Sequence, residues 1–120
     1  MKYLLDTSIL IWWLTGDNRL KTETRGIISS SSYVKYVSVI SVWEIIIKSQ
    51  AKKLKLVVPL KKVLDDFGFE ILNINLDHVL KMDALPLIHK DPFDRMLIAQ
   101  SMVENCKLLT SDKKVLKYFN

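Results

Sequence analysis

The chain has 120 residues, of which 49% are hydrophobic and 26% charged, so disorder is excluded and one domain over residues 1–120 is expected. The single cysteine, Cys106, excludes a disulfide framework. The longest apolar run, Ile9–Leu14, is far shorter than the roughly 20 residues that span a bilayer. We therefore expect a cytoplasmic protein with no membrane contact. The net charge is +5, and the stretch between Glu44 and Asp65 contains six lysines and no acid, which is typical either of a surface that binds a polyanion or of a solvated lysine face.

The first half of the chain alternates short apolar runs with helical patterns. Strands are predicted at Tyr3–Leu5 and Tyr36–Ile40, and helices at Ile9–Leu14 and Lys21–Ser30. A longer helix follows the second strand. Its core face is predicted from helical spacing and carries Trp43, Ile46, Ile47, Ala51 and Leu54.

The second half continues the alternation. After Pro59 we expect a short helix whose apolar residues are Val63, Leu64 and Phe67, then a strand at Glu70–Ile74 and a helix at Asp77–Asp83. Asp91-Pro92 opens a helix with inward residues Phe93, Met96, Leu97, Met102 and Val103. A strand at Lys107–Leu109 and a helix from Ser111-Asp112 complete the chain. This order predicts one doubly wound α/β unit with a parallel sheet.

Four acids follow or face the ends of the predicted strands. Asp6 follows the first strand, Glu44 lies about one turn past the second, Asp112 comes three residues after Leu109, and Asp94 lies in the first turn of the helix before the last strand. Because the carboxyl ends of parallel strands meet at one edge of a sheet, we expect these carboxylates to converge there.

Each acid also has a simpler interpretation as a helix cap. Ser41 and Glu44 fit the spacing of a capping box, and an acid in the first turn of a helix is favoured by the helix dipole. Four carboxylates together are harder to explain in this way. Two unit charges about 4 Å apart repel by about 4 kcal/mol at an effective dielectric constant near 20, unless a cation neutralises them.

Oxygen ligands without a cysteine or histidine cluster suit Mg²⁺ or Mn²⁺. A carboxylate cluster that holds one or two such ions is suited to the hydrolysis of phosphodiesters. The hydroxyls of Thr7 and Thr110 flank the acids and are expected to orient water or metal, whereas Ser8 and Ser111 are better explained as helix caps.

A row of lysines leads away from one of the acids. Glu44, Lys48, Lys52 and Lys55 are spaced by four, four and three residues, so we expect them on one helical face. Such a row could guide the phosphate backbone of a nucleic acid toward the metal. The alternative is a Glu44–Lys48 surface pair beside solvated lysines.

Several segments of the chain resemble the PIN-domain nucleases, and most closely the VapC-type toxins of bacterial toxin–antitoxin pairs. The resemblance runs from residue 2 to about residue 118 and is carried by four segments: Leu4–Ser8, Ser41–Lys48, His89–Ala99 and Leu109–Asp112. The most specific is Asp91-Pro92-Phe93-Asp94-Arg95, which is typical of one PIN subgroup.

This resemblance implies a three-layer α/β/α fold with a short parallel sheet of four or five strands. It also implies a Mg²⁺- or Mn²⁺-dependent endoribonuclease that forms a homodimer and is inhibited by a cognate antitoxin. By position, Asp6, Glu44 and Asp94 correspond to the central acidic ligands, Asp112 to a more variable fourth acid, and Thr110 to a hydroxyl near the metal. The roles of His89 and Arg95 are not specified by the resemblance.

Two other functions are compatible with an α/β domain of this length. A receiver-like phosphoacceptor domain also binds Mg²⁺, but it would have an acidic neighbour beside Asp6. The second alternative is an inert PIN-like module that binds RNA or protein. For the protein partners, the apolar segment Ile9–Trp13 and the tail residues Leu116, Tyr118 and Phe119 are either core or interface.

Overall fold

Four parallel strands form a single sheet in the computed structural model, which describes residues 1–119. The strands are β1 Lys2–Leu5, β2 Val34–Ser38, β3 Glu70–Leu72 and β4 Lys107–Leu109, in the spatial order β3-β2-β1-β4. In the register of the sheet, Leu4 of central β1 lies opposite Tyr36 on one side and Leu108 on the other. The predicted parallel sheet is confirmed, and all four carboxyl ends lie at one edge.

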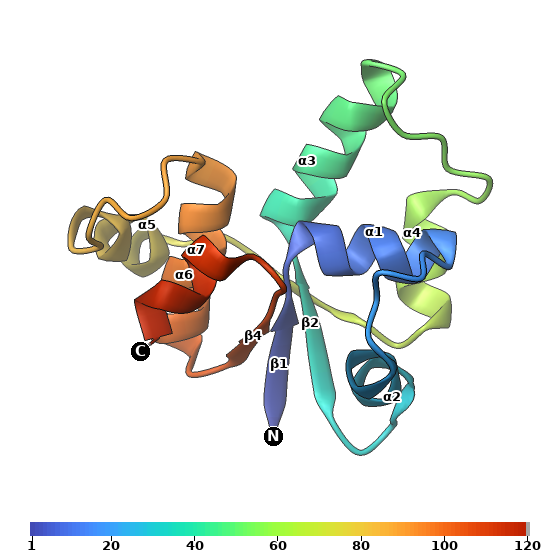
Figure 1. Ribbon diagram of the computed structural model, residues 1–120, viewed down its shortest axis with the longest axis horizontal. Coiled ribbons are helices and arrows are strands. Elements are labelled where there is room, and N and C mark those ends of the chain that lie inside the picture. The colour runs from blue at the N-terminus through green and yellow to red at the C-terminus, as the bar shows by residue number, and fades with distance from the viewer. Residues whose placement is uncertain (120) are drawn as a thin grey trace.

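Helices cover both faces of this sheet. They are α1 Thr7–Thr15, α2 Thr22–Ser29, α3 Val39–Gln50, α4 Leu60–Asp66, α5 Leu76–Asp83, α6 Pro92–Glu104 and α7 Lys113–Leu116, followed by a 3₁₀ turn, η1, at Lys117–Phe119. Figure 1 shows α1, α2 and α4 on one side of the strands and α5, α6 and α7 on the other, which makes the three-layer arrangement. Within residues 1–119, each helix is too short or too polar to cross a membrane.

The two cores follow from the alternation of side chains along β1. Tyr3 and Leu5 point to the layer of α1, α2 and α4, while Leu4 points to the layer of α6. Leu4 and Leu5 are both fully buried. A strand with helices on both faces must be apolar at consecutive positions, as this one is.

The strand predicted at Tyr36–Ile40 ends earlier than expected, at Ser38, and the next helix buries a different face from the predicted one. Ser38 ends β2, and its hydroxyl accepts the Ile40 N–H (3.1 Å), so α3 begins at Val39. The buried residues of α3 are Ile40, Ser41 and Ile45.

The predicted core face of α3 is therefore wrong. Trp43, Ile46 and Ile47 are 55%, 45% and 39% exposed, and Leu54 lies beyond the end of the helix at Gln50. Helical periodicity identifies an apolar stripe but not which neighbour covers it. Here α3 packs against α1 and α6 through a different row of residues.

Other differences concern single residues near the ends of elements. β3 ends at Leu72 rather than Ile74. Val103, expected to point inward, is 37% exposed, and Phe67, predicted as an apolar residue of a short helix, is 50% exposed. Phe67 follows the last residue of α4, where its ring makes an edge contact with Trp13 (5.4 Å between ring centroids).

A buried polar contact joins α5 to α6. The side chain of His78 is fully buried, and its Nδ1 accepts the Asn75 N–H (3.1 Å), so Nε2 carries the hydrogen. This Nε2–H donates to Oε2 of Glu104, the last residue of α6 (2.7 Å). The contact gives the buried His78 Nε2–H an acceptor at the C-terminal end of α6, whereas Asp94 lies at the N-terminal end of this helix.

We expect Glu104→Ala to lower the free energy of unfolding by about 1–3 kcal/mol, because it leaves the buried His78 Nε2–H without its acceptor. Urea denaturation would measure the change. Glu104→Gln keeps an acceptor at the same position and should recover most of the stability, whereas equal stability of Glu104→Ala and the wild type would show that the contact is unimportant.

Candidate functional site

Asp6 lies at the junction between β1 and α1 at the carboxyl edge of the sheet. Its N–H donates to the Leu109 carbonyl at the end of β4 (3.0 Å), and its Oδ1 accepts the Ile9 N–H (2.8 Å). The residue is 5% exposed. Asp6 is thus the N-cap of α1, as the simpler interpretation holds, and it is also a buried carboxylate at this edge.

Asp94 is not the cap of its helix. That role belongs to Asp91, whose Oδ1 accepts the Phe93 N–H (2.8 Å). The Asp94 carboxylate instead approaches His89, with 3.0 Å between Oδ2 and Nε2. Because Asp91 satisfies the helix start, the Asp94 carboxylate is left available to the sheet edge.

Asp112 begins the short helix after β4. Its Oδ1 accepts the Lys114 and Val115 N–H groups (2.8 and 3.3 Å), and its Oδ2 lies 3.2 Å from His89 Nε2. The Asp112 N–H donates to the Thr110 hydroxyl (3.1 Å). Both cap and cluster interpretations therefore describe this residue.

Glu44 points to the same region from the second turn of α3. The predicted capping box with Ser41 is absent, because Ser38 caps this helix and the Ser41 hydroxyl accepts a hydrogen bond from Thr7 (3.0 Å). Glu44 Oε2 lies 3.4 Å from Lys48 Nζ. Its Oε1 is buried and has no hydrogen-bond partner among residues 1–119, so this oxygen is suited to a ligand that the chain itself does not supply.

The charges of these acids influence one another: Asp6 interacts electrostatically with Glu44 and Asp112, and Asp94 interacts with Glu44 and Asp6. Burial raises the pKa of Asp6 to about 6, against hydrogen bonds from Thr110 and Ile9, and repulsion from Asp112 and Glu44 adds to the rise. Burial also raises the pKa of Asp94 to about 6. The carboxylates of Asp91, Glu44 and Asp6 add to the rise, while His89 counters it.

Asp112 behaves in the opposite way. Burial alone would raise its pKa, but hydrogen bonds from His89 and from the Lys114 and Val115 N–H groups outweigh burial and lower it. The edge therefore combines one carboxylate with a lowered pKa, Asp112, and two with a raised pKa, Asp6 and Asp94, because burial disfavours the charged form of the latter two. A divalent cation would stabilise the charged form.

His89 is a member of this cluster that the sequence did not assign. Atoms of His89, Asp94 and Asp112 that could contact one ion all lie within 4.8 Å of one another. The motif around Asp94 contains His89, but only the fold brings both beside Asp112. Arg95, whose role was also unassigned, donates to the carbonyls of Met82 and Pro86 (3.2 and 2.9 Å) and so holds the segment before His89.

The two threonines differ in their surroundings. Thr110 accepts the Asp112 N–H, and its hydroxyl helps to counter the rise in the pKa of Asp6. Thr7 is 3% exposed and donates to Ser41, which ties α1 to α3. Thr110 is therefore the hydroxyl in direct contact with the acids.

The predicted lysine row does not form one helical face. Lys48 lies on α3, but the helix ends at Gln50, Lys52 has a left-handed backbone (φ 58°), and Lys55 lies in the following segment. The hollow beside Glu44 is lined instead by Lys48, Lys53 and Lys90, together with Phe93. Helical spacing could not find Lys53 or Lys90, because neither lies on a helix.

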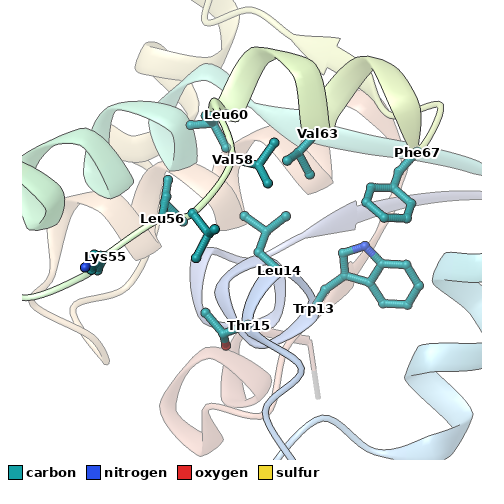
Figure 2. A pocket seen from close by; sticks show the side chains of 10 residues that line it. Trp13, Leu14, Thr15, Lys55, Leu56, Val58, Leu60, Val63 and Phe67 are labelled. Carbon is teal, nitrogen blue, oxygen red and sulfur yellow. The ribbon is translucent and has the colours of Figure 1, made fainter.

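A separate apolar hollow lies between α1, α4 and the segment that joins α3 to α4. Figure 2 shows Trp13 and Leu14 of α1 facing Leu56, Val63 and Phe67 across it.

The apolar segments that the sequence left as core or interface differ in exposure. Trp12 and Trp13 are partly buried against the core, and Arg19 lies over the Trp12 ring (4.9 Å). At the tail, Leu116 and Phe119 are 44% and 45% exposed.

Comparisons with known proteins identify a family from the sequence and a similar fold among solved structures. A model of the PIN domain family matches residues 3–119. The chain also resembles a chain in the crystal structure of VapBC2 from Rickettsia felis bound to a DNA fragment from their promoter, with a TM-score of 0.65 and 17% identity over 98% of this chain and 92% of that chain. At this identity the likeness concerns the fold. No curated protein matches the sequence.

The raised pKa of Asp6 predicts how stability depends on pH in the absence of divalent cations. Unfolded Asp6 ionises near pH 3.8 and folded Asp6 near 6, so the folded state binds more protons between these values and loses stability as the pH rises through them. For this buried group the loss is about 3 kcal/mol.

Urea denaturation in chelator between about pH 3.5 and 7.5 would measure this loss. Asp6→Asn keeps a side-chain acceptor for the Ile9 N–H and removes the charge, so we expect a flatter pH profile and a more stable protein at pH 7.5. Asp77→Asn, in the first turn of α5, is the matched control. Identical slopes for Asp6→Asn and the wild type would contradict the prediction.

Proposed function

Because the chain belongs to the PIN domain family, we propose that it is a metal-dependent endoribonuclease of the VapC type that hydrolyses phosphodiester bonds of RNA. The observation that carries this proposal is that Asp94 and Asp112 both contact His89 at the carboxyl edge, while Asp6 and Glu44 interact electrostatically with Asp94 and a buried Glu44 oxygen is left unpaired within residues 1–119. Such an arrangement is costly without a cation. An inert PIN-like module would have no need to retain it.

We assign the ion to the oxygens of Asp6, Glu44, Asp94 and Asp112. An all-carboxylate set of ligands favours Mg²⁺ or Mn²⁺ over softer metals, and it could hold one or two ions. When bound, the cation supplies Lewis-acid activation of the attacking water and stabilises charge on the phosphate.

The chain's own residues supply position and charge around this centre. The caps at Asp6 and Asp112 fix both carboxylates against backbone N–H groups. The Thr110 hydroxyl lies between these acids and can orient a water by hydrogen bonding. Lys48, Lys53 and Lys90 surround the adjacent hollow, where they could contact phosphates on either side of the bond to be cut.

Protein partners are part of the same proposal. The exposed apolar residues Trp43, Ile46 and Ile47 of α3 form a surface suited to a second copy of the chain or to a cognate antitoxin. The likeness to a chain of the VapBC2 assembly supports an antitoxin partner. A protein of this type would act in the cytoplasm, where its RNA substrates are.

The nuclease proposal is tested by RNA cleavage with purified protein. We expect cleavage with Mg²⁺ or Mn²⁺, none in excess chelator, and a reduction of about two orders of magnitude or more for Asp94→Asn, because removal of a ligand charge weakens ion binding and transition-state stabilisation. Asp77→Asn serves as the control. Binding of RNA without cleavage by the wild type would favour the inert module.

The lysines make a separate prediction about the salt dependence of RNA binding. In chelator, the logarithm of the binding constant should fall linearly with the logarithm of salt concentration, and Lys53→Gln and Lys90→Gln should each reduce the slope by about 0.7. Filter binding of single-stranded RNA would measure it. Lys61→Gln and Lys62→Gln change lysines that already pair with Asp65 and Asp66, so their slopes should stay near that of the wild type.

A further inference from the structure

The motif around Asp94 contains a histidine whose ring is held in a defined state. The Asp91 backbone N–H donates to Nδ1 of His89 (3.1 Å). A backbone N–H can only donate, so Nδ1 is an acceptor and carries no hydrogen. The neutral ring therefore has its hydrogen on Nε2.

This Nε2–H lies between two carboxylates of the candidate metal site. It is 3.0 Å from Asp94 Oδ2 and 3.2 Å from Asp112 Oδ2. The His89 side chain is 14% exposed, so the contact is shielded from water. One donor thus holds together two acids that would otherwise repel each other.

We propose that His89 is a positioning residue of the metal site, acting as a neutral hydrogen-bond donor to Asp94 and Asp112 and not as a metal ligand. To ligate through Nε2, the ring would need its hydrogen on Nδ1, where the Asp91 N–H already points. As a donor, His89 occupies one lone pair on Oδ2 of Asp94 and one on Oδ2 of Asp112, and the remaining lone pairs of these carboxylates stay available to the ion. This inference rests on the proposed metal-dependent function and specifies how its site is held.

A clamp built from Arg95 and Tyr118 holds His89 in this pose. The Tyr118 hydroxyl accepts the His89 N–H (2.8 Å) and donates to the Pro86 carbonyl (2.7 Å), and Arg95 donates to the same carbonyl and to the same hydroxyl (2.9 and 3.1 Å). The segment before α6 is therefore fastened to η1 and to the first turn of α6. Arg95, next to Asp94 in the motif, positions the loop that carries His89.

The consequence for the ion is a more ordered pair of ligands. Without the His89 donor, Asp94 and Asp112 would separate under their mutual repulsion and would have to be brought together again by the cation. Mutation of a residue that orients metal ligands by hydrogen bonding typically lowers the metal affinity 10–100-fold.

The proposal is tested by Mn²⁺ binding, followed by isothermal titration calorimetry and by electron spin-echo envelope modulation of the Mn²⁺-loaded protein. We expect wild-type protein to bind Mn²⁺ without the modulation of a directly bonded imidazole ¹⁴N nucleus. His89→Leu should bind about 10–100-fold more weakly. His89→Gln, whose amide can donate at the same reach, should recover part of the affinity.

Tyr118→Phe keeps His89 and all four acids, so it tests the clamp even where His89→Leu does not fold. It should weaken Mn²⁺ binding in the same direction. Direct ¹⁴N coordination in the wild type, or His89→Leu or Tyr118→Phe binding as tight as the wild type, would overturn the assignment while leaving the nuclease proposal intact. Wild-type protein that binds no Mn²⁺ would instead overturn the proposed function itself.

Discussion

The burial of carboxylates at the carboxyl edge of the sheet, with a smaller contribution from their mutual repulsion, is the constraint on which the rest of this structure depends. Asp6 and Asp94 both have a pKa raised to about 6, largely by burial, and each feels the charge of Glu44. A fold that needed only stability would not gather these groups. The surrounding hydrogen bonds, from the caps of α1 and α7 and from His89, are arranged to hold them in spite of the repulsion.

The residues of the motif around Asp94 have separate roles, which keep the Asp94 carboxylate available at the edge of the sheet. Asp91 caps the helix, which leaves Asp94 available to the site, and its N–H also sets the hydrogen of His89 on Nε2. The hydrogen bonds of the Arg95 side chain within the described residues go to carbonyl oxygens and to the Tyr118 hydroxyl. Adjacent residues of one segment thus serve as cap, candidate ligand and clamp.

The helix α3 separates two surfaces with different chemistry. Glu44, Ile47 and Lys48 line the hollow beside the acidic site, while Trp43 and Ile46 are exposed beside α4. Trp43 also contacts the Phe93 ring of α6 (5.2 Å between centroids), so the apolar surface continues up to the candidate site. A partner bound to this surface would lie close enough to affect access to the acids.

The sequence by itself determined the alternation of strands and helices, the parallel sheet and the positions of Asp6 and Asp112 beyond the ends of β1 and β4, because these depend on local periodicity and on the rule that parallel strands end at one edge. It could not determine which face of α3 is buried, since Trp43, Ile46 and Ile47 have the same spacing whether or not a neighbour covers them. Only the tertiary structure brought His89 to Asp112, 23 residues away, and Lys90 to the hollow beside Glu44. Such contacts depend on the path of loops, which carry no periodic signal.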